Sequence, residues 1–369
     1  MLTKLFKRRL VALWLCATLI VMLPGNALAW GVEGHRITAR IAAMHLNPVA
    51  RAEVIKLLRT DIRNNAGYYQ KNCANVLGLG KKGTLTKKEE DGFLVEGMAC
   101  IAPWPDPPVK DQRLYTSNWH FVDIPVVLNN AGGSEPLRFK YNPARDCIMD
   151  VKRGDCAVQA LERLRAVLGN PKNSTQEDRL YGEEMTARAE ALKFFVHIVG
   201  DIHQPLHCAA DKKDEQAVSN PKDLGDMGGN LKVATWFGEP KTPYGPMNIH
   251  SIWDGGIITH TLKVENLTEA QYYQNLLKAI PAKGSPELAN MQAGDFFDWF
   301  EGSYDLAVRK AYGELPKLDP NCGVTKDGHL TDCYQLADNY YNANKGIVDQ
   351  QLKTGGVRLG RLVNEILGK

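Results

Sequence analysis

The sequence feature that most constrains this chain is a histidine and an aspartate four residues apart inside a strongly apolar stretch. Apolar residues recur at helical spacing from Thr186 to about His203, and no proline interrupts the run before Pro205, so we predict a helix there. His197 and Asp201 then lie on one face of that helix, one turn apart. Burying an imidazole or a carboxylate alone is costly, so these two side chains need polar partners.

A bound metal ion is one such partner, and a hydrogen bond between the two side chains inside the core is the alternative. Histidine nitrogens and carboxylate oxygens are ligands that suit zinc. Two further observations favour a metal. His207 follows just beyond Pro205, and His250 and Asp254 repeat the same spacing later in the chain.

A short run from Asn118 to Ile124 carries another histidine among aromatic and β-branched residues. This composition predicts a brief strand or extended segment. Alternation places His120 on one side of the segment and places Phe121 and Asp123 on the other. An aromatic residue and an acid on the side away from a histidine is an unusual arrangement for a core strand.

Two loops add further polar side chains. The proline-rich residues 102–108 predict a rigid, extended loop that holds Asp106 in a fixed direction, although an aspartate in such a loop is also a common turn residue. A later polar loop ends in Gly228, Gly229 and Asn230. Paired glycines permit close backbone approach, so Asn230 could contact a substrate or support a ligand. A plain hairpin turn is the alternative there.

The first 29 residues have the features of an export leader. A basic segment precedes an apolar run from Leu10 to Leu23, and residues 27–29 match a small-residue cleavage site. The run is too short for a comfortable membrane span, and no other stretch approaches about 20 apolar residues. We therefore expect an exported, soluble protein, periplasmic or secreted. Removing the leader takes four positive charges from a net charge of +3 and leaves −1, so the mature chain has no global basic field.

Cleavage after Ala29 would make Trp30 the new N-terminus, five residues before His35. A free α-amine beside a backbone carbonyl can chelate a metal, and the low pKa of an α-amine permits deprotonation when metal binds. A frayed terminus without a role is the alternative.

Seven cysteines remain after the leader, so at least one is unpaired or pairs with another chain. Export permits disulfides. The pairs Cys147–Cys156 and Cys322–Cys333 are close enough in sequence to staple loops, and we predict a disulfide for the first pair. The sequence leaves the full connectivity open.

The C-terminal third has helical patterns at Asp295–Tyr312, Gln335–Asn344 and Val357–Leu367. These segments carry no obvious chemistry, and we interpret them as separate core helices. Neither an internal repeat nor a linker is evident, so we expect residues 30–369 to form one domain.

Together these motifs resemble the zinc-dependent phospholipase C and nuclease superfamily. They are most similar to the exported, three-zinc, single-strand-specific nucleases with 3′-nucleotidase activity. The motifs that carry the resemblance are Trp30-x4-His35, Asp106, His120-Phe121-x-Asp123, His197-x3-Asp201-x5-His207, Gly228-Gly229-Asn230 and His250-x3-Asp254. Each motif is weak alone, but their order and spacing are specific. The family's fold implies a mainly α-helical single domain with a trinuclear zinc cluster in a cleft.

For this chain the resemblance implies three zinc ions. The implied ligand sets are Asp106, His120, His197 and Asp201 for one ion, the Trp30 amine and carbonyl with His35 and Asp201 for the second, and His207, His250 and Asp254 for the third. Asp201 would bridge the first two ions. A water between those ions would attack phosphorus, and the third ion would stabilise the leaving 3′-oxygen.

The resemblance also implies how the substrate is held. Phe121 would stack on a base, Asp123 would hydrogen-bond the base edge, and Met227 would cover the other base face. Stacking requires an unstacked base, hence a preference for single-stranded DNA and RNA and for 3′-nucleotides. The family commonly has a basic residue three positions after the loop aspartate. Here Val109 holds that place, and we expect the next residue, Lys110, to substitute for it.

Two other functions compete with a nuclease. A zinc-dependent phospholipase C shares the metal cluster, but it usually has a glutamate in the third site and a longer tryptophan-to-histidine spacing. The other alternative is a zinc-binding protein without catalysis. The only feature that favours it is the absence of a basic residue at position 109, where this chain has valine. We expect a monomer without a membrane span in its mature form.

Overall fold

The computed structural model describes residues 30–106, 113–128, 136–170, 172, 184–220, 222–243 and 245–369. The expected leader, Val109 and Lys110 lie outside the described residues. The fold is mainly α-helical with small sheets, as predicted. The helices of the first half are α1 (Val32–Met44), α2 (Pro48–Asn64), α3 (Ala66–Asn72), α4 (Ala74–Gly80), α5 (Lys87–Ile101), η1 (Leu114–His120), α7 (Pro143–Asp146) and α8 (Ala157–Gly169).

The helices of the second half follow the same order along the chain. They are α9 (Glu184–Asp201), η3 (Pro205–His207), α10 (Glu215–Val218), α11 (Ile249–Ser251), η4 (Ile252–Gly256), α12 (Ile257–Val264), α13 (Glu269–Lys278), α14 (Pro286–Gln292), α15 (Phe296–Leu306), η5 (Ala307–Tyr312) and α16 (Asp338–Leu367). None of the described helices is both long enough and apolar enough to cross a membrane.

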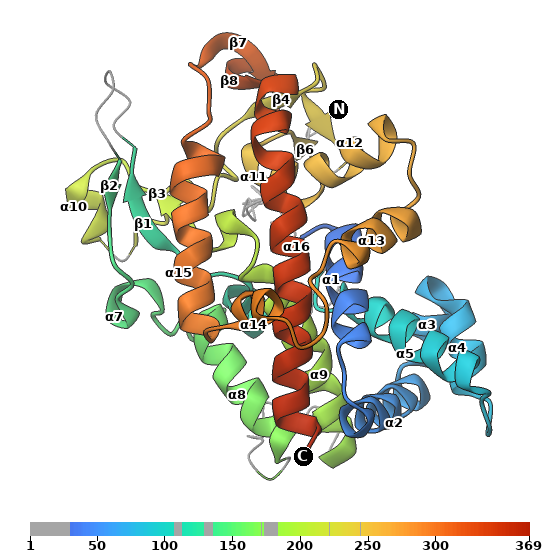
Figure 1. The fold of residues 1–369 in the computed structure, drawn as a ribbon. Coiled ribbons are helices and arrows are strands. Elements are labelled where there is room, and N and C mark those ends of the chain that lie inside the picture. Colours follow the sequence, from blue (N-terminus) through green and yellow to red (C-terminus); the bar gives the residue numbers. More distant parts are fainter. Residues whose placement is uncertain are drawn as a thin grey trace, which may run out of the picture.

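The long C-terminal helix α16 runs through the middle of the molecule, and α15 and α1 lie on either side of it in Figure 1. The prediction of two helices at Gln335–Asn344 and Val357–Leu367 was wrong in two ways. Gln335 and Leu336 lie in a strand, and one helix, α16, is then continuous from Asp338 to Leu367. Its glycines do not break it; they let α1 approach closely. A Cβ at Gly356 would lie 2.5 Å from the Cβ of Ile41.

The central helix α9 begins at Glu184 and ends at Asp201, close to the predicted limits. It packs against α8, α2 and α16, and α1 packs against α16, α5 and α9. These helices enclose the apolar side chains of α9, so Phe195 and Ile198 are fully buried. The two polar side chains His197 and Asp201 are also fully buried.

Three small sheets complete the fold. Their orders are β2 (Leu137–Arg138), β1 (Ile124–Val127), β3 (Ala209–Asp211); β4 (Ala234–Trp236), β8 (Leu330–Leu336), β7 (Asp319–Val324); and β5 (Lys241–Thr242), β6 (Gly245–Pro246). The parallel pairing of β1 with β3 places Ile124 opposite Ala209. It brings the segment after His120 beside the segment after His207, and Val122 N donates to the His207 carbonyl at 2.8 Å.

The prediction of a strand or extended segment from Asn118 was wrong in its first half. Residues 114–120 form the 3-10 helix η1, and the strand begins only at Ile124. The predicted alternation still describes the last residues, since Val122 is buried while Phe121 and Asp123 are half-buried.

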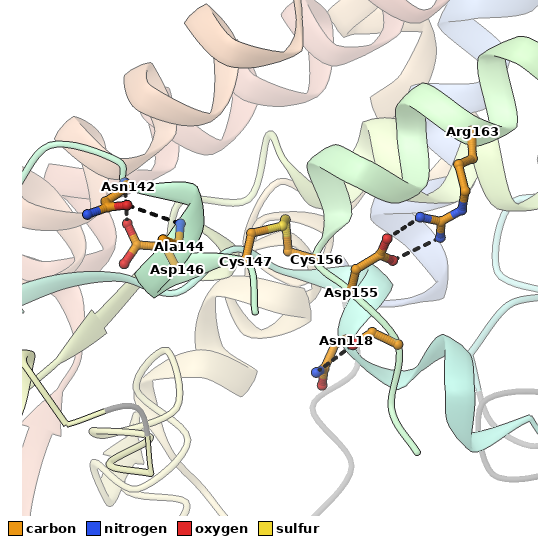
Figure 2. Close-up of a disulfide and its surroundings, with 9 residues drawn as sticks. Asn118, Asn142, Ala144, Asp146, Cys147, Asp155, Cys156 and Arg163 are labelled. Atoms are coloured by element: carbon orange, nitrogen blue, oxygen red, sulfur yellow. Dashed lines mark hydrogen bonds and ion pairs between the residues drawn. A yellow bond between two sulfur atoms is a disulfide. The ribbon is translucent and has the colours of Figure 1, made fainter. Parts of the chain in front are cut away.

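The predicted disulfide Cys147–Cys156 is confirmed (Figure 2). Cys322–Cys333 also forms, and Cys73–Cys100 joins the residue between α3 and α4 to α5 in a pairing that the sequence left open. The seventh cysteine, Cys208, is buried and free. Three disulfides are typical of proteins from oxidising compartments.

Candidate metal centre and active site

The first polar cluster is built around the carboxylate of Asp201 at the end of α9. Its Oδ1 lies 3.3 Å from His35 Nε2, and its Oδ2 lies 3.3 Å from His197 Nε2. The same Oδ2 lies 3.1 Å from His120 Nδ1. Three histidines from α1, η1 and α9 therefore converge on one buried carboxylate. On the far side of this cluster, Asp106 Oδ1 lies 3.7 Å from His197 Nε2.

His35 reaches this cluster because residue 200 is a glycine. A Cβ at Gly200 would lie 2.9 Å from His35 Nδ1 and 3.8 Å from the Trp30 ring. The His35 ring stacks on the His197 ring with centroids 3.9 Å apart. Trp30 is fully buried beside them. Burial, with the nearby rings of His197 and His207, holds the pKa of His35 well below its usual value, so this imidazole is neutral.

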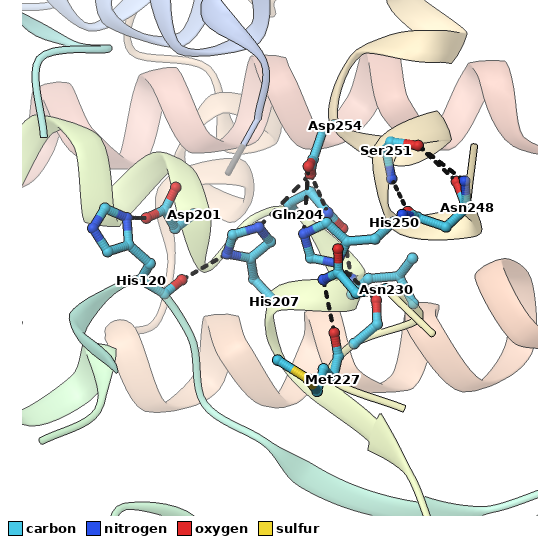
Figure 3. A network of polar contacts seen from close by, with 12 residues as sticks. His120, Asp201, Gln204, His207, Met227, Asn230, Asn248, His250, Ser251 and Asp254 are labelled. Atoms are coloured by element: carbon cyan, nitrogen blue, oxygen red, sulfur yellow. Dashed lines mark hydrogen bonds and ion pairs between the residues drawn. The ribbon is translucent and has the colours of Figure 1, made fainter. Parts of the chain in front are cut away.

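The second polar cluster is built around Asp254, which lies in the π-helical turn η4 that follows α11 (Figure 3). His250 Nε2 lies 3.4 Å from Asp254 Oδ2, and His207 Nε2 lies 3.7 Å from Asp254 Oδ1. Asn248 caps the helix that carries His250 and forms a capping box with Ser251. The cap fixes where α11 begins, and so fixes the direction of His250.

Backbone carbonyls orient three of these histidines. His197 Nδ1 lies 2.7 Å from the Ala102 carbonyl, His207 Nδ1 lies 2.6 Å from the His120 carbonyl, and His250 Nδ1 lies 2.7 Å from the Gly228 carbonyl. A carbonyl only accepts, so each Nδ1 carries the proton and each Nε2 directs a lone pair at the cluster. This is the support that metal-binding histidines usually have.

Both clusters fit zinc. Ligand atoms of a tetrahedral zinc site lie roughly 3.3 Å apart, given metal–ligand bonds of about 2.0 Å. The distances above bracket that value, and neutral imidazoles with carboxylates are its usual ligands. Neither ring nitrogen of His35 has a hydrogen-bond partner among the described residues, although the ring is fully buried. Buried polar atoms are normally paired, so the two nitrogens of His35 support its role as a metal ligand.

Among the described residues, three groups of side chains could hold a metal ion, because the ligand atoms within each group lie within 4.8 Å of one another. They are His35, Asp106 and His197; His120, His197 and Asp201; and His207, His250 and Asp254. All nine predicted ligand residues except Trp30 occur in these groups, and Trp30 lies against His35.

A cavity of about 270 Å³ opens beside both clusters. His120 and His207 line it together with the predicted base-binding residues Phe121, Asp123 and Met227. Asn230 lines it too, but its side-chain amide donates to the Met227 carbonyl at 2.9 Å (Figure 3). In this structure Asn230 therefore also holds the turn that presents Met227.

The glycines before Asn230 have a packing role. Gly228 adopts a φ of 63°, and a Cβ there would lie 2.3 Å from the Leu206 carbonyl. This close approach lets the Gly228 carbonyl orient His250. The turn is thus part of the second cluster, in place of the plain hairpin that was the alternative.

Asp123 is half-buried, and its pKa is raised to about 7. Burial is the main cause, Asp226 and Asp146 raise the pKa further, and Lys212 opposes them. A carboxyl group that titrates near neutral pH either donates or accepts a hydrogen bond, depending on the pH.

The comparison with known families agrees with this geometry. The family model described as S1/P1 nuclease matches residues 30–368. The chain belongs to the S1/P1 nuclease family. It is similar to Endonuclease 4 of Arabidopsis thaliana, with 28% identity over 96% of this chain and 94% of the relative. It is also similar to Endonuclease 5 of that plant (25%, 96% of each chain) and to Nuclease S1 of Aspergillus oryzae (24%, 89% of each chain). Membership of the S1/P1 nuclease family confirms the resemblance and identifies the protein as a phosphodiester-hydrolysing nuclease.

Sequence reasoning missed the groups that support the ligands in this S1/P1 nuclease. Gln204 Nε2 donates to Asp254 Oδ1 at 2.7 Å, and Gln204 Oε1 accepts from Leu206 N at 2.6 Å. Gln204 stands inside the motif Asp201-x5-His207, so its position next to the ligands was a usable signal. The carbonyls of Ala102 and Gly228 carry no such signal, because a backbone oxygen has no residue identity.

Proposed function

We propose that the mature chain is a three-zinc endonuclease and 3′-nucleotidase. Its substrates would be single-stranded DNA, single-stranded RNA and 3′-nucleotides, and its products would carry 5′-phosphates. The observation that carries this proposal is the meeting of two carboxylate-centred histidine clusters with a cavity that Phe121 and Asp123 line. The clusters supply the groups for phosphate chemistry, and the cavity supplies the groups for a base.

Within the two clusters we keep the ligand assignment that the resemblance implies. Asp106, His120, His197 and Asp201 would hold one zinc; Trp30, His35 and Asp201 the second; and His207, His250 and Asp254 the third. When bound, the zinc ions supply a water of lowered pKa and charge stabilisation for the phosphate. Asp201 would serve as a ligand to the first two ions, because each of its oxygens faces a different histidine.

The cavity residues would select the nucleotide. Phe121 offers a ring for stacking, Met227 lines the same cavity and would cover the other base face, and Asp123 offers a carboxyl group for the base edge. Because stacking requires a base outside a duplex, this cavity favours single strands. Lys110 remains our proposed cation for the phosphate; it lies outside the described residues, and Lys110→Ala with zinc content as control tests it.

Export and processing would complete the site. Trp30 is buried and borders Gly200 together with His35, the family match begins at Trp30, and the three disulfides suit an oxidising compartment outside the cytoplasm. We expect cleavage after Ala29 to expose the Trp30 amine as a ligand. A variant that keeps one extra residue before Trp30 should lose zinc and most activity. Equal zinc content and activity in the extended and native proteins would contradict this step.

The direct test is zinc-dependent turnover by the purified mature protein on single-stranded DNA, RNA, 3′-AMP and phosphatidylcholine. We expect cleavage of both single strands and phosphate release from 3′-AMP, with faster cleavage of single than of double strands. Faster turnover of phosphatidylcholine would instead support a phospholipase C. No turnover of any substrate by zinc-loaded protein would support zinc binding without catalysis.

A further inference from the structure

The hairpin between Cys147 and Cys156 forms part of the wall of the same cavity. Ile148, Met149 and Arg153 from this hairpin line the cavity together with Phe121 and His207. The hairpin therefore adds a surface to the cavity beyond the residues already assigned to metal or base. We propose that it is a second nucleotide subsite, which binds the nucleotide that precedes the one held by Phe121.

The hairpin is fixed to η1 and to Phe121, which directly follows η1. Asn118 N in η1 donates to the Arg153 carbonyl at 3.0 Å, and Ala157 N donates to the Phe121 carbonyl at 3.0 Å. Gly154, with a φ of 84°, makes close packing possible, because a Cβ there would lie 2.1 Å from the Tyr115 carbonyl. The disulfide closes the other end (Figure 2). The hairpin and the base pocket thus form one rigid frame, as a subsite requires.

The apolar side chains of the hairpin are exposed where they line the cavity. Ile148 is 48% exposed and Met149 is 59% exposed. Ile148 and Met149 are adjacent and both line the cavity, and contiguous exposed apolar surface beside a pocket is typical of a binding surface. Methionine is flexible and polarisable, and packs well against flat rings. These two side chains offer a base a face without demanding one base identity.

The hairpin also offers a cation for a phosphate. Arg145 lines the cavity but is held by Asp146, with Nη2 to Oδ2 at 2.8 Å, and by the Lys140 carbonyl. Arg153 lines the cavity and makes none of the ion pairs formed by the described residues. Its guanidinium therefore remains available for the phosphate that links two nucleotides.

The direction of the strand follows from the proposed function, on which this inference rests. If the 3′-phosphate of the bound nucleotide faces the metal clusters while its base contacts Phe121, then any further nucleotide in the cavity is joined on its 5′ side. A 3′-mononucleotide cannot use such a subsite, whereas a dinucleotide 3′-phosphate can. The subsite would thus favour strands over mononucleotides.

The test compares two substrates that lose the same terminal phosphate. The kcat/KM for ApA formation from ApAp is compared with that for adenosine formation from 3′-AMP. Arg153→Ala should lower kcat/KM on ApAp by roughly threefold to tenfold and leave kcat/KM on 3′-AMP unchanged. Arg153→Lys should restore part of the loss. Met149→Ala should also lower kcat/KM on ApAp alone. Lys152→Ala and Val151→Ala are matched controls, because both residues are exposed on the same hairpin but do not line the cavity.

Salt dependence gives a second readout. Loss of one phosphate contact to a single strand should reduce the slope of log kcat/KM against log salt for ApAp by about 0.7. We expect this change in Arg153→Ala and not in Lys152→Ala. Equal losses on ApAp and 3′-AMP would overturn the inference and show that the hairpin only supports the base pocket. If the ratio of kcat/KM on ApAp to kcat/KM on 3′-AMP is unchanged in the hairpin variants, the inference is wrong, but an active wild type still supports the proposed function. A wild type that is inactive on both substrates would refute the proposed function itself.

Discussion

The two His-x3-Asp pairs have the same spacing but different surroundings. His197 and Asp201 end a regular 18-residue helix, and both are fully buried. His250 and Asp254 lie on a three-residue helix that continues into a π-helical turn, and His250 lines the cavity. Among the described residues, candidate ligands from three other segments lie around the first pair, and His207 completes the candidate metal group of the second.

Two pairs with the same sequence spacing are therefore held in different ways. The enclosed pair holds its cluster through many packed helices, so a change there should affect the whole site. The pair at the cavity depends on local supports, namely the Asn248 cap, the Gly228 carbonyl and Gln204. We expect the cluster around Asp201 to hold metal more tightly, and the cluster around Asp254 to exchange metal faster.

The largest effect should come from Asp201→Ala. Asp201 faces His35 with one oxygen and His197 with the other, so its loss should release two zinc ions. Activity should fall by more than about a thousandfold, beyond the loss from one stabilising group. Zinc content and turnover of a single-stranded oligonucleotide measure this. If the variant keeps two or more zinc ions, Asp201 does not serve two ions, and the proposed difference between the clusters is wrong.

A smaller effect should come from Gln204→Leu, which removes the hydrogen bond to Asp254 and leaves the enclosed cluster untouched. Losing a support of this kind lowers metal affinity by about 10-fold to 100-fold. Zinc titration should show one weakened site. If all sites weaken together, the clusters are coupled and the comparison fails.

Phe121→Ala should affect nucleotides without affecting metal. Losing one stacked base costs roughly 1–3 kcal/mol, or about fivefold to 150-fold in kcat/KM for 3′-AMP and oligonucleotides. Activity on bis(p-nitrophenyl) phosphate, which has no base, should change little. Parallel losses on both substrates would mean that Phe121 supports the metal clusters instead.

The smallest effect should come from Asp123→Asn, and it should depend on pH. The pKa of Asp123 is raised to about 7 in the folded chain, mainly by burial, from an ordinary value of 3.8. The folded state therefore favours the protonated form, and the stability it gains from protonation is lost as the pH rises through about 7. The Tm of Asp123→Asn, relative to wild type, should be higher at pH 8 than at pH 5. The wild-type ranking of bases should change between those pH values, and the variant ranking should not. A constant Tm difference would contradict the raised pKa.

The sequence predicted the helix of His197 and Asp201 because hydrophobic periodicity and the absence of proline are local signals. It also predicted the Cys147–Cys156 disulfide, because the two cysteines are near each other in sequence. It did not predict that α16 is continuous, because glycines at 355 and 356 weaken a helical pattern unless a neighbouring helix is known to pack there. It missed η1, since a 3-10 helix of aromatic and polar residues has the composition of an extended segment.

The site was predictable in its side chains and not in its supports. Histidines and aspartates at fixed spacing are visible in a sequence, and resemblance to a family assigned them to three ions. The meeting of His35 with Gly200, and of His250 with the Gly228 carbonyl, depends on backbone placement across long sequence separations. Such contacts leave no periodic pattern to find.

The most direct test of the account is the time course of zinc release from the mature protein under excess chelator. We predict about three zinc ions per chain, by the number of ligand sets, with one released fast and two slowly. His250→Ala should lose the fast ion and keep the slow pair. A single ion per chain, or release of all ions in one phase that His250→Ala does not change, would contradict two clusters of unequal enclosure.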